Sequence, residues 1–158
     1  MKQIISLTIL LLVANCVFAT DYYINSNSGN DKNDGKTENT AWESLSKVNE
    51  QIFQPGDKIL FAAGSAFEGQ LSPKGSGKKG SVIKIDRYGK GKNPAIHGKG
   101  EKEYTLLLYN VEYWEVRNLE ITNQGKEREA KRRGVIIRAE NFGECHHIVL
   151  EGLEIHNV

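Results

Sequence analysis

The chain has 158 residues and carries 21 Lys and Arg against 20 Asp and Glu. Nucleic-acid-binding proteins usually show a basic excess, so this balance excludes nucleic acid as a partner. Hydrophobic residues make up 39% of the chain, enough for one modest domain with a packed core.

The N-terminus reads as an export signal. Lys2 precedes an apolar run from Ile4 to Ala14, and small residues at Val17 and Ala19 predict a Sec-type signal peptide cleaved after Ala19. The run is too short to span a membrane, so we expect a secreted, periplasmic or surface protein with no membrane span after cleavage. A lipoprotein signal at Cys16 is the alternative, although the residues on either side of it fit poorly.

Cleavage would leave a neutral chain with one thiol. It removes Lys2 and no acidic residue, so 20 basic and 20 acidic groups remain. Cys145 is then the single cysteine and an internal disulfide is excluded, so stability must come from packing.

The predicted second region, residues 20–56, contains a strand, turns and a helix. A short strand at 22–25 precedes a run of Asn, Asp and Gly at 26–40, which is typical of turns. Thr40 and Glu43 form a capping-box pattern, and the stripe of Trp42, Leu45, Val48 and Ile52 predicts one buried helix face that ends before Pro55.

The turn-rich run does not match the ligand pattern of an EF-hand calcium loop. With Asp31 as the first ligand, Gly35 falls on the fifth position instead of the sixth, and Trp42 stands where the loop needs Glu. The plain turn interpretation is therefore favoured.

The third region, residues 57–158, predicts short strands separated by Gly-rich turns, with no second strong amphipathic helix. The expected strands are 57–61, 68–71, 81–85, 94–98, 104–109, 113–116, 119–122, 134–139, 147–150 and 153–156. A doubly wound α/β sheet would need a helix between successive parallel strands, so that fold class is excluded.

An octapeptide repeat indicates how the strands are joined. "VRNLEITN" at 116–123 returns as "LEGLEIHN" at 150–157, an offset of 34 residues. Alternation of apolar residues breaks at Asn118 and Gly152, two residue types that accept the left-handed conformation of a tight bend. The repeat therefore predicts an all-β right-handed parallel β-helix, a solenoid in which Val116 stacks on Leu150.

Two further residues of the repeat predict a polar ladder. Asn123 and Asn157 follow the strand ends with inward parity, so their amides are expected to stack and hydrogen-bond at the next turn. Two ordinary Asn turn residues are the alternative.

The strand at 22–25, the turn-rich run, the helix and the coils that follow resemble the start of secreted pectate-lyase-like right-handed parallel β-helix proteins from polysaccharide-degrading bacteria. The resemblance covers nearly the whole mature chain. It implies that the helix caps the open N-terminal end of the solenoid, that only the first few coils are present and the chain is truncated, and that the catalytic residues lie in coils beyond Val158.

The resemblance implies a carbohydrate-active enzyme that degrades an extracellular polysaccharide, as a lyase or a glycoside hydrolase. A non-catalytic β-helix for glycan binding or surface adhesion, or an inactive fragment, is the alternative. The partner would be a polysaccharide, which a lyase would need to be acidic. No cofactor is assigned; calcium would serve a lyase that uses it to neutralise a uronate. The oligomeric state is left open.

Two stacked carboxylates are the candidate catalytic residues. Leu119 and Ile121 point inward, so Glu120 and Glu154 face outward one repeat apart, about 5 Å from each other at the backbone. A hydrolase needs two carboxylates about 5 to 9.5 Å apart. The alternative is two solvated glutamates whose repulsion is relieved by Arg117 or nearby lysines.

Three other outward residues are candidates for substrate binding. Arg138 and Glu140 lie two residues apart on one face and could hold a sugar or pair with each other. His156 lies two residues after Glu154 and is expected to face outward, at the position that Thr122 holds one repeat earlier. Cys145 to His147 are metal-ligand types, but three consecutive residues do not converge on one point, so no metal site is assigned.

Overall fold

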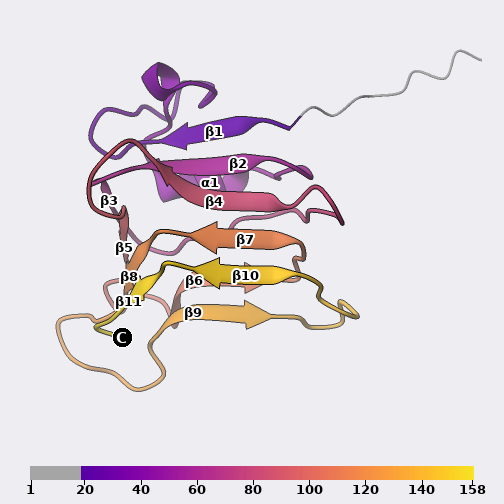
Figure 1. The fold of residues 1–158 in the computed structure, drawn as a ribbon. Coiled ribbons are helices and arrows are strands. Elements are labelled where there is room, and N and C mark those ends of the chain that lie inside the picture. Colours follow the sequence, from indigo (N-terminus) through magenta and orange to yellow (C-terminus); the bar gives the residue numbers. More distant parts are fainter. Residues whose placement is uncertain (1–18) are drawn as a thin grey trace, which may run out of the picture.

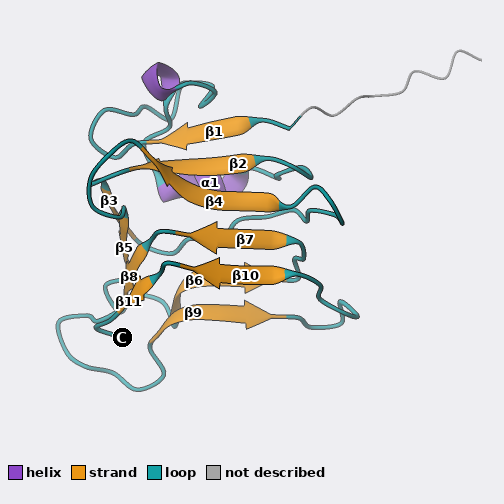
Figure 2. Cartoon of the chain, in the orientation of Figure 1, coloured by secondary structure: helices purple, strands orange, loops and turns teal. Residues whose placement is uncertain are grey.

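The computed structural model describes residues 19–158, and the predicted signal peptide lies almost entirely outside them. The fold is mostly β, with parallel sheets and very little helix (Figure 2). None of the helices in the described part is long and apolar enough to cross a membrane.

The strands form three parallel sheets (Figure 1). The first sheet has the order β1 (Asp21–Ile24), β2 (Lys58–Ala62), β4 (Ile83–Tyr88), β7 (Trp114–Arg117) and β10 (Ile148–Glu151). The second sheet has the order β3 (Ala66–Glu68), β5 (Ala95–His97), β8 (Glu120–Thr122) and β11 (Glu154–Ile155). The third sheet pairs β6 (Tyr104–Tyr109) with β9 (Arg133–Arg138).

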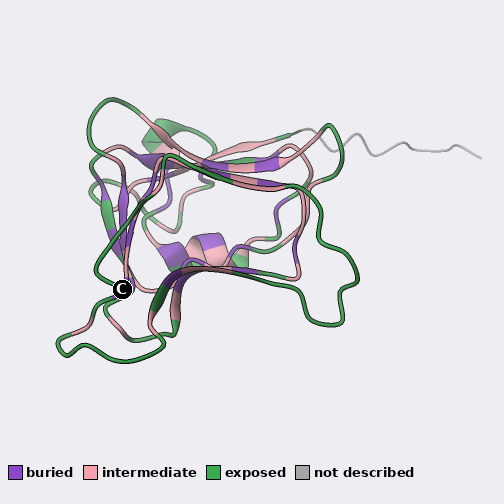
Figure 3. Cartoon of the chain, turned by 60° about the horizontal axis from the view of Figure 1, so that its bottom comes forward, coloured by how far each residue is buried: buried purple, intermediate pink, exposed green. Residues whose placement is uncertain are grey.

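Over its last six strands, the chain visits these sheets in turn and adds one parallel strand at each visit. From β6 onward the order is third, first, second, third, first and second sheet. Figure 3 shows the three sides around an interior lined by buried segments. The predicted strands are confirmed with small shifts at their ends, except that the strand expected at 68–71 lies earlier, at Ala66–Glu68.

The interior is a column of aliphatic and aromatic side chains from alternate strand positions. Trp114 and Val116 of β7 are fully buried, and so are Ile96 of β5 and Ile121 of β8. Since side chains alternate across a strand, their neighbours along the chain face outward. The apolar pattern thus decides which polar residues reach the surface.

The 34-residue repeat is confirmed as a stacking register. Val116 pairs with Leu150, and Ile121 pairs with Ile155. Asn118 and Gly152 have φ angles of 53° and 63°, so both adopt the predicted left-handed conformation between the two strands of the octapeptide. The bend joins the first sheet to the second.

Helix α1 (Leu45–Glu50) starts later than predicted, and the capping box at Thr40 and Glu43 is wrong. Ser44 is the N-cap and accepts from the Lys47 N–H at 3.2 Å. The Asp31 carboxylate accepts from the backbone N–H of Glu43 and of Ser44, at 2.8 and 3.0 Å. Those bonds hold the approach to the helix extended, so the helix cannot begin before residue 45.

The fold of the turn-rich run brings Asp31 close to the start of the helix. It folds back as turns, and the 3₁₀ helix η1 (Glu38–Thr40) carries its own capping box between Thr37 and Thr40. Burial acts to raise the pKa of Asp31, but hydrogen bonds from Ser44 and the backbone outweigh it and lower that pKa. Asp31 therefore anchors a helix start.

The buried face of α1 is shorter than its stripe predicts. Leu45 and Val48 are buried on the helix and Trp42 is buried before it begins, but Ile52 is 60% exposed and Phe53 enters the core in its place. The helix ends at Glu50, so helical spacing no longer places Ile52. Figure 1 places α1 behind β2 and β4. Its role as an end cap stays a prediction.

The expected Asn ladder is wrong, because the Asn123 side chain bonds to backbone groups instead. Asn123 is fully buried, and its Nδ2 lies 3.0 to 3.2 Å from the carbonyl oxygens of Lys102, Glu103 and Arg133. Its Oδ1 accepts from the Gly100 N–H at 3.2 Å. Asn123 thus ties the end of β8 to the loop before β6 and to β9. Asn157 is exposed.

We expect Asn123→Ala to lower the free energy of unfolding by about 3 kcal/mol, because it removes the hydrogen bonds that the fully buried Asn123 side chain makes to backbone groups. Chemical denaturation of the two forms measures the loss. Gln124→Ala, at the exposed neighbouring position, is the control and should change stability by less than about 0.5 kcal/mol. Equal losses in both variants would contradict the anchoring role.

Candidate functional site

The outward face of the second sheet holds a hollow of about 500 Å³. It lies where β5, β8 and the segment after β11 end. Its lining residues are almost all polar or charged: His97, Lys99, Glu120, Thr122, Gln124, Gly125, His156 and Asn157. We call this hollow the second-sheet groove.

Register places the outward side chains of the second sheet, in and beside the groove, in two rows. One row contains Glu68, His97 and Thr122, which are direct partners on β3, β5 and β8. The other row contains Glu120 and Glu154, partners on β8 and β11. The inward Ile96 and Ile121 fix both rows, because a one-residue slip would expose them.

Glu120 and Glu154 are stacked as predicted, and each carboxylate has its own partner. His156 Nε2 lies 3.2 Å from Glu120 Oε1. Asn93 Nδ2 donates to Glu154 Oε1 at 2.8 Å. Two neighbouring carboxylates repel each other, and these partners reduce that repulsion.

Arg117, the predicted counter-charge for the two glutamates, serves other carboxylates. It pairs with Glu115 at 3.4 Å and with Glu151 on the next strand of the first sheet. The strand change at Asn118 separates it from Glu120. His156, predicted only as a substrate-binding residue, therefore supplies the partner of Glu120.

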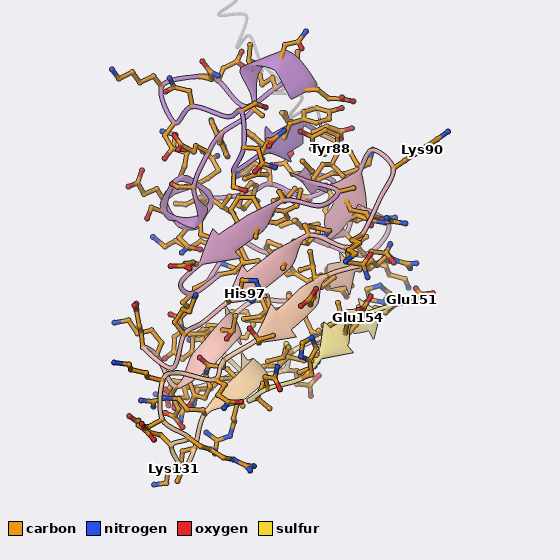
Figure 4. The ribbon with its side chains drawn as sticks, turned by 90° about the vertical axis from the view of Figure 1, so that its left-hand side faces the viewer. Tyr88, Lys90, His97, Lys131, Glu151 and Glu154 are labelled. Carbon is orange, nitrogen blue, oxygen red and sulfur yellow. The ribbon has the colours of Figure 1, made fainter. Side chains whose placement is uncertain are left out.

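His97 is a groove residue that the sequence did not single out. Its Nδ1 lies 2.8 Å from the Thr122 Oγ1, in the middle of the groove. Figure 4 shows His97 and Glu154 on the side of the molecule formed by the second sheet. The sequence signal was weak, because His97 and Thr122 are 25 residues apart and the visible repeat is 34.

Lys99 closes one end of the groove and was also missed. Its Nζ lies 2.8 Å from Glu68 Oε1, and its backbone has a left-handed φ of 55°. The hydrogen bond from Lys99 and its positive charge lower the pKa of Glu68 below the ordinary value. The groove therefore offers ammonium, imidazole, hydroxyl and carboxylate groups within one surface.

Arg138 and Glu140 do not line the groove. They pair with each other at 3.1 Å, and the Tyr109 hydroxyl donates to Glu140 at 3.0 Å. The hydrogen bond to Glu140 and its charge raise the pKa of Tyr109. Both residues are exposed at the end of β9, so their predicted role in sugar binding stays a prediction.

The Cys145 to His147 segment also lies outside the groove. The Cys145 thiol donates to the Val111 carbonyl at 2.9 Å, and His146 contacts Glu112 at 2.9 Å. Burial raises the pKa of the Cys145 thiol. Across residues 19–158, no group of three or more His, Cys, Asp or Glu is arranged to hold a metal ion.

The groove has the chemistry of a sugar-binding surface. Sugar hydroxyls donate and accept hydrogen bonds, and the groove places donors next to acceptors in each row. Glu120 and Glu154 stand on adjacent parallel strands, about 5 Å apart at the backbone.

Comparisons with known proteins find glycoside hydrolases. A lacto-N-biosidase of Bifidobacterium longum subsp. longum is 33% identical over 88% of this chain, which corresponds to 12% of that protein. The crystal structure of a GH136 lacto-N-biosidase from Eubacterium ramulus, as its selenomethionine derivative, superposes with a TM-score of 0.80 at 36% identity. The crystal structure of the native protein superposes with a TM-score of 0.76 at 33% identity.

The match to the solved structures covers 88% of this chain and 27% of theirs. The chain thus spans about a quarter of the solved proteins. No protein-family model matches the chain. The predicted resemblance to carbohydrate-active proteins is therefore confirmed, because the matched proteins are glycoside hydrolases.

We expect Lys99→Met to raise the pKa of Glu68 toward its ordinary value, because the hydrogen bond and the charge that lower it are both lost. Carboxyl-carbon NMR titration of the two forms measures the change. Lys92→Met, which removes a lysine outside the groove, is the control. An unchanged titration of Glu68 in Lys99→Met would mean that the ion pair does not form in solution.

Proposed function

We propose that this protein is a secreted glycoside hydrolase that releases lacto-N-biose from an oligosaccharide, and that residues 19–158 form its N-terminal part. The observation that carries the proposal is the superposition on GH136 lacto-N-biosidase, with a TM-score of 0.80 and 36% identity over 88% of the chain. A likeness at that level of identity supports a shared reaction, and the polar groove supports a sugar ligand.

The proposal includes the finer fold, a right-handed parallel β-helix with further coils after those described. The cyclic order of the strands among three parallel sheets supports it. So does the exposure of inward apolar residues in the last layer: Leu150 and Ile155 are 39% and 47% exposed, although Val116 and Ile121 one layer above are fully buried. Another coil would cover them, as each layer here covers the one before it.

In this proposal the second-sheet groove binds part of the oligosaccharide. His97, Lys99 and Gln124 offer donors, and Glu120 offers an acceptor, within the 500 Å³ hollow. Lys99, the lysine of the groove, is already paired with Glu68 at 2.8 Å, so a neutral sugar can bind beside it without leaving its charge unpaired. A neutral lacto-N-biose unit therefore fits better than an acidic glycan.

Glu120 and Glu154 are the proposed carboxylates of this surface. Their stacked register supports the short separation of a retaining mechanism, in which one carboxylate attacks and the other transfers the proton. His156, 3.2 Å from Glu120, would orient that carboxylate. A groove that only binds sugar is the competing role, and substitution of both glutamates separates the two.

Export belongs to the same proposal, because the substrate of such an enzyme is extracellular. The signal pattern that ends at Ala19 supports Sec-dependent export with cleavage after that residue. Thr20 follows it directly and begins the described fold, since the Lys58 N–H donates to the Thr20 carbonyl at 2.9 Å.

The reaction is tested on the protein expressed with every residue that its gene encodes. We expect it to release lacto-N-biose from a p-nitrophenyl β-lacto-N-bioside, measured by p-nitrophenolate absorbance and by chromatography of the sugar. A hydrolase product gains a reducing end without an ultraviolet-absorbing double bond. A product with that double bond, or no product from any oligosaccharide, would overturn the proposal.

The carboxylate roles predict that Glu120→Gln and Glu154→Gln each lower kcat by about 100-fold or more in that protein, because general acid–base catalysis is worth about that much. Glu101→Gln, outside the groove, should keep full turnover. If both glutamate variants turn over at the normal rate and only KM rises, this face of the second sheet binds sugar without taking part in the chemistry.

A further inference from the structure

Asp57 is a buried carboxylate with two neutral hydrogen-bond donors. It lies in the turn before β2 and is 1% exposed. Its Oδ2 accepts from the Gln54 N–H at 2.8 Å, and its Oδ1 accepts from the Thr20 N–H at 2.8 Å. Within the described residues, no Lys, Arg or His forms an ion pair with it. The nearest cation in sequence, Lys58, pairs with Asp21 at 3.2 Å.

A buried charge without a counter-charge is costly. Removing a carboxylate from water is repaid only by a cation together with hydrogen bonds to the remaining oxygen. The two neutral N–H donors supply hydrogen bonds to Asp57, but they supply no positive charge. The Asp57 carboxylate also acts on Tyr22. The pKa of the Tyr22 phenol is raised, mainly by burial and secondly by the negative charge of Asp57. Asp57 therefore lacks a cation, and Thr20 is the group closest to supplying one.

We propose that Asp57 is the binding site for the α-ammonium group that signal cleavage creates at Thr20. Cleavage adds water across the Ala19–Thr20 peptide bond. The carboxylate leaves with the signal peptide, and the new amine on Thr20 takes up a proton. The nitrogen that bears the charge already lies 2.8 Å from the Asp57 Oδ1. A neutral hydrogen bond becomes a charge-assisted one without a large movement of either atom.

The surroundings hold the new terminus in place. The Thr20 carbonyl accepts from the Lys58 N–H at 2.9 Å, which continues the pairing of β1 with β2. The titratable groups that face this terminus are Asp57 from the turn, Lys58 from β2, and Asp21 and Tyr22 from β1. Because Lys58 and Asp21 pair with each other, Asp57 is the carboxylate left for the ammonium group.

This site couples processing to folding. The exported chain gains an ion pair that the precursor lacks, so the mature fold is more stable than the precursor fold. A less stable precursor suits a protein that must cross a membrane unfolded. The inference rests on the predicted cleavage after Ala19 and on the Asp57 contacts, and not on glycosidase activity. Each can therefore fail without the other.

The test compares three forms of the mature chain: one that begins with a free Thr20, one with the same terminus acetylated, and one that retains residues 18 and 19. Acetylation keeps the N–H and removes the charge. We expect the free form to melt about 3 °C or more above both others at pH 6. Mass spectrometry of protein purified from producing cells should show Thr20 as the first residue.

Asp57→Asn in the same three forms supplies the control, because Asn keeps a hydrogen-bond acceptor without the charge. The differences in Tm should vanish in that background. They should also shrink in the parent chain as the pH rises above about 8, where an ordinary α-amino group loses its proton. A Tm gap that survives Asp57→Asn, or equal Tm values for free and acetylated chains, would overturn the proposal. If Asp57→Asn does not fold, the acetylation comparison and its pH dependence decide alone.

Discussion

In-register stacking of short parallel strands is the constraint on which the rest of this molecule depends. Each strand contributes only a few residues, so its inward side chains are buried by the strands above and below it together with the facing sheets, as Phe61 packs against Phe67 across the interior. Val116 on Leu150 and Ile121 on Ile155 show the rule over one full repeat. The same register that buries these residues aligns the outward residues into rows. The second-sheet groove is therefore a consequence of how the core is packed.

The bends between sheets impose a second requirement, which the chain meets with particular side chains. Asn118 and Gly152 accept the left-handed conformation that joins the first sheet to the second. A different bend depends on Asn123, whose buried side-chain amide donates to the carbonyl oxygens of Lys102 and Arg133 where the chain leaves β8. Gly98 gives this amide room, because a Cβ there would lie 2.3 Å from Asn123 Oδ1. Stacking thus determines how the strands pair, and a few polar residues determine where the strands end.

The 34-residue repeat made one part of the site predictable from sequence, and its absence elsewhere hid the rest. Glu120 and Glu154 were predicted as neighbours because their strands repeat in sequence as well as in space. His97 reaches Thr122 across 25 residues, and no sequence similarity marks that spacing. Strand positions followed well from apolar patterns and turn residues. The start of α1 did not, because a distant carboxylate, Asp31, captures the N–H groups that local rules assign to a capping box.

The proposed function depends on the second-sheet groove holding part of an oligosaccharide. The direct measurement is a crystal structure of the whole encoded protein soaked with lacto-N-biose. We expect sugar density in the groove, with hydroxyl groups within hydrogen-bond distance of Glu120, His156 and His97. Sugar bound only at other coils, with this groove filled by ordered water, would contradict it.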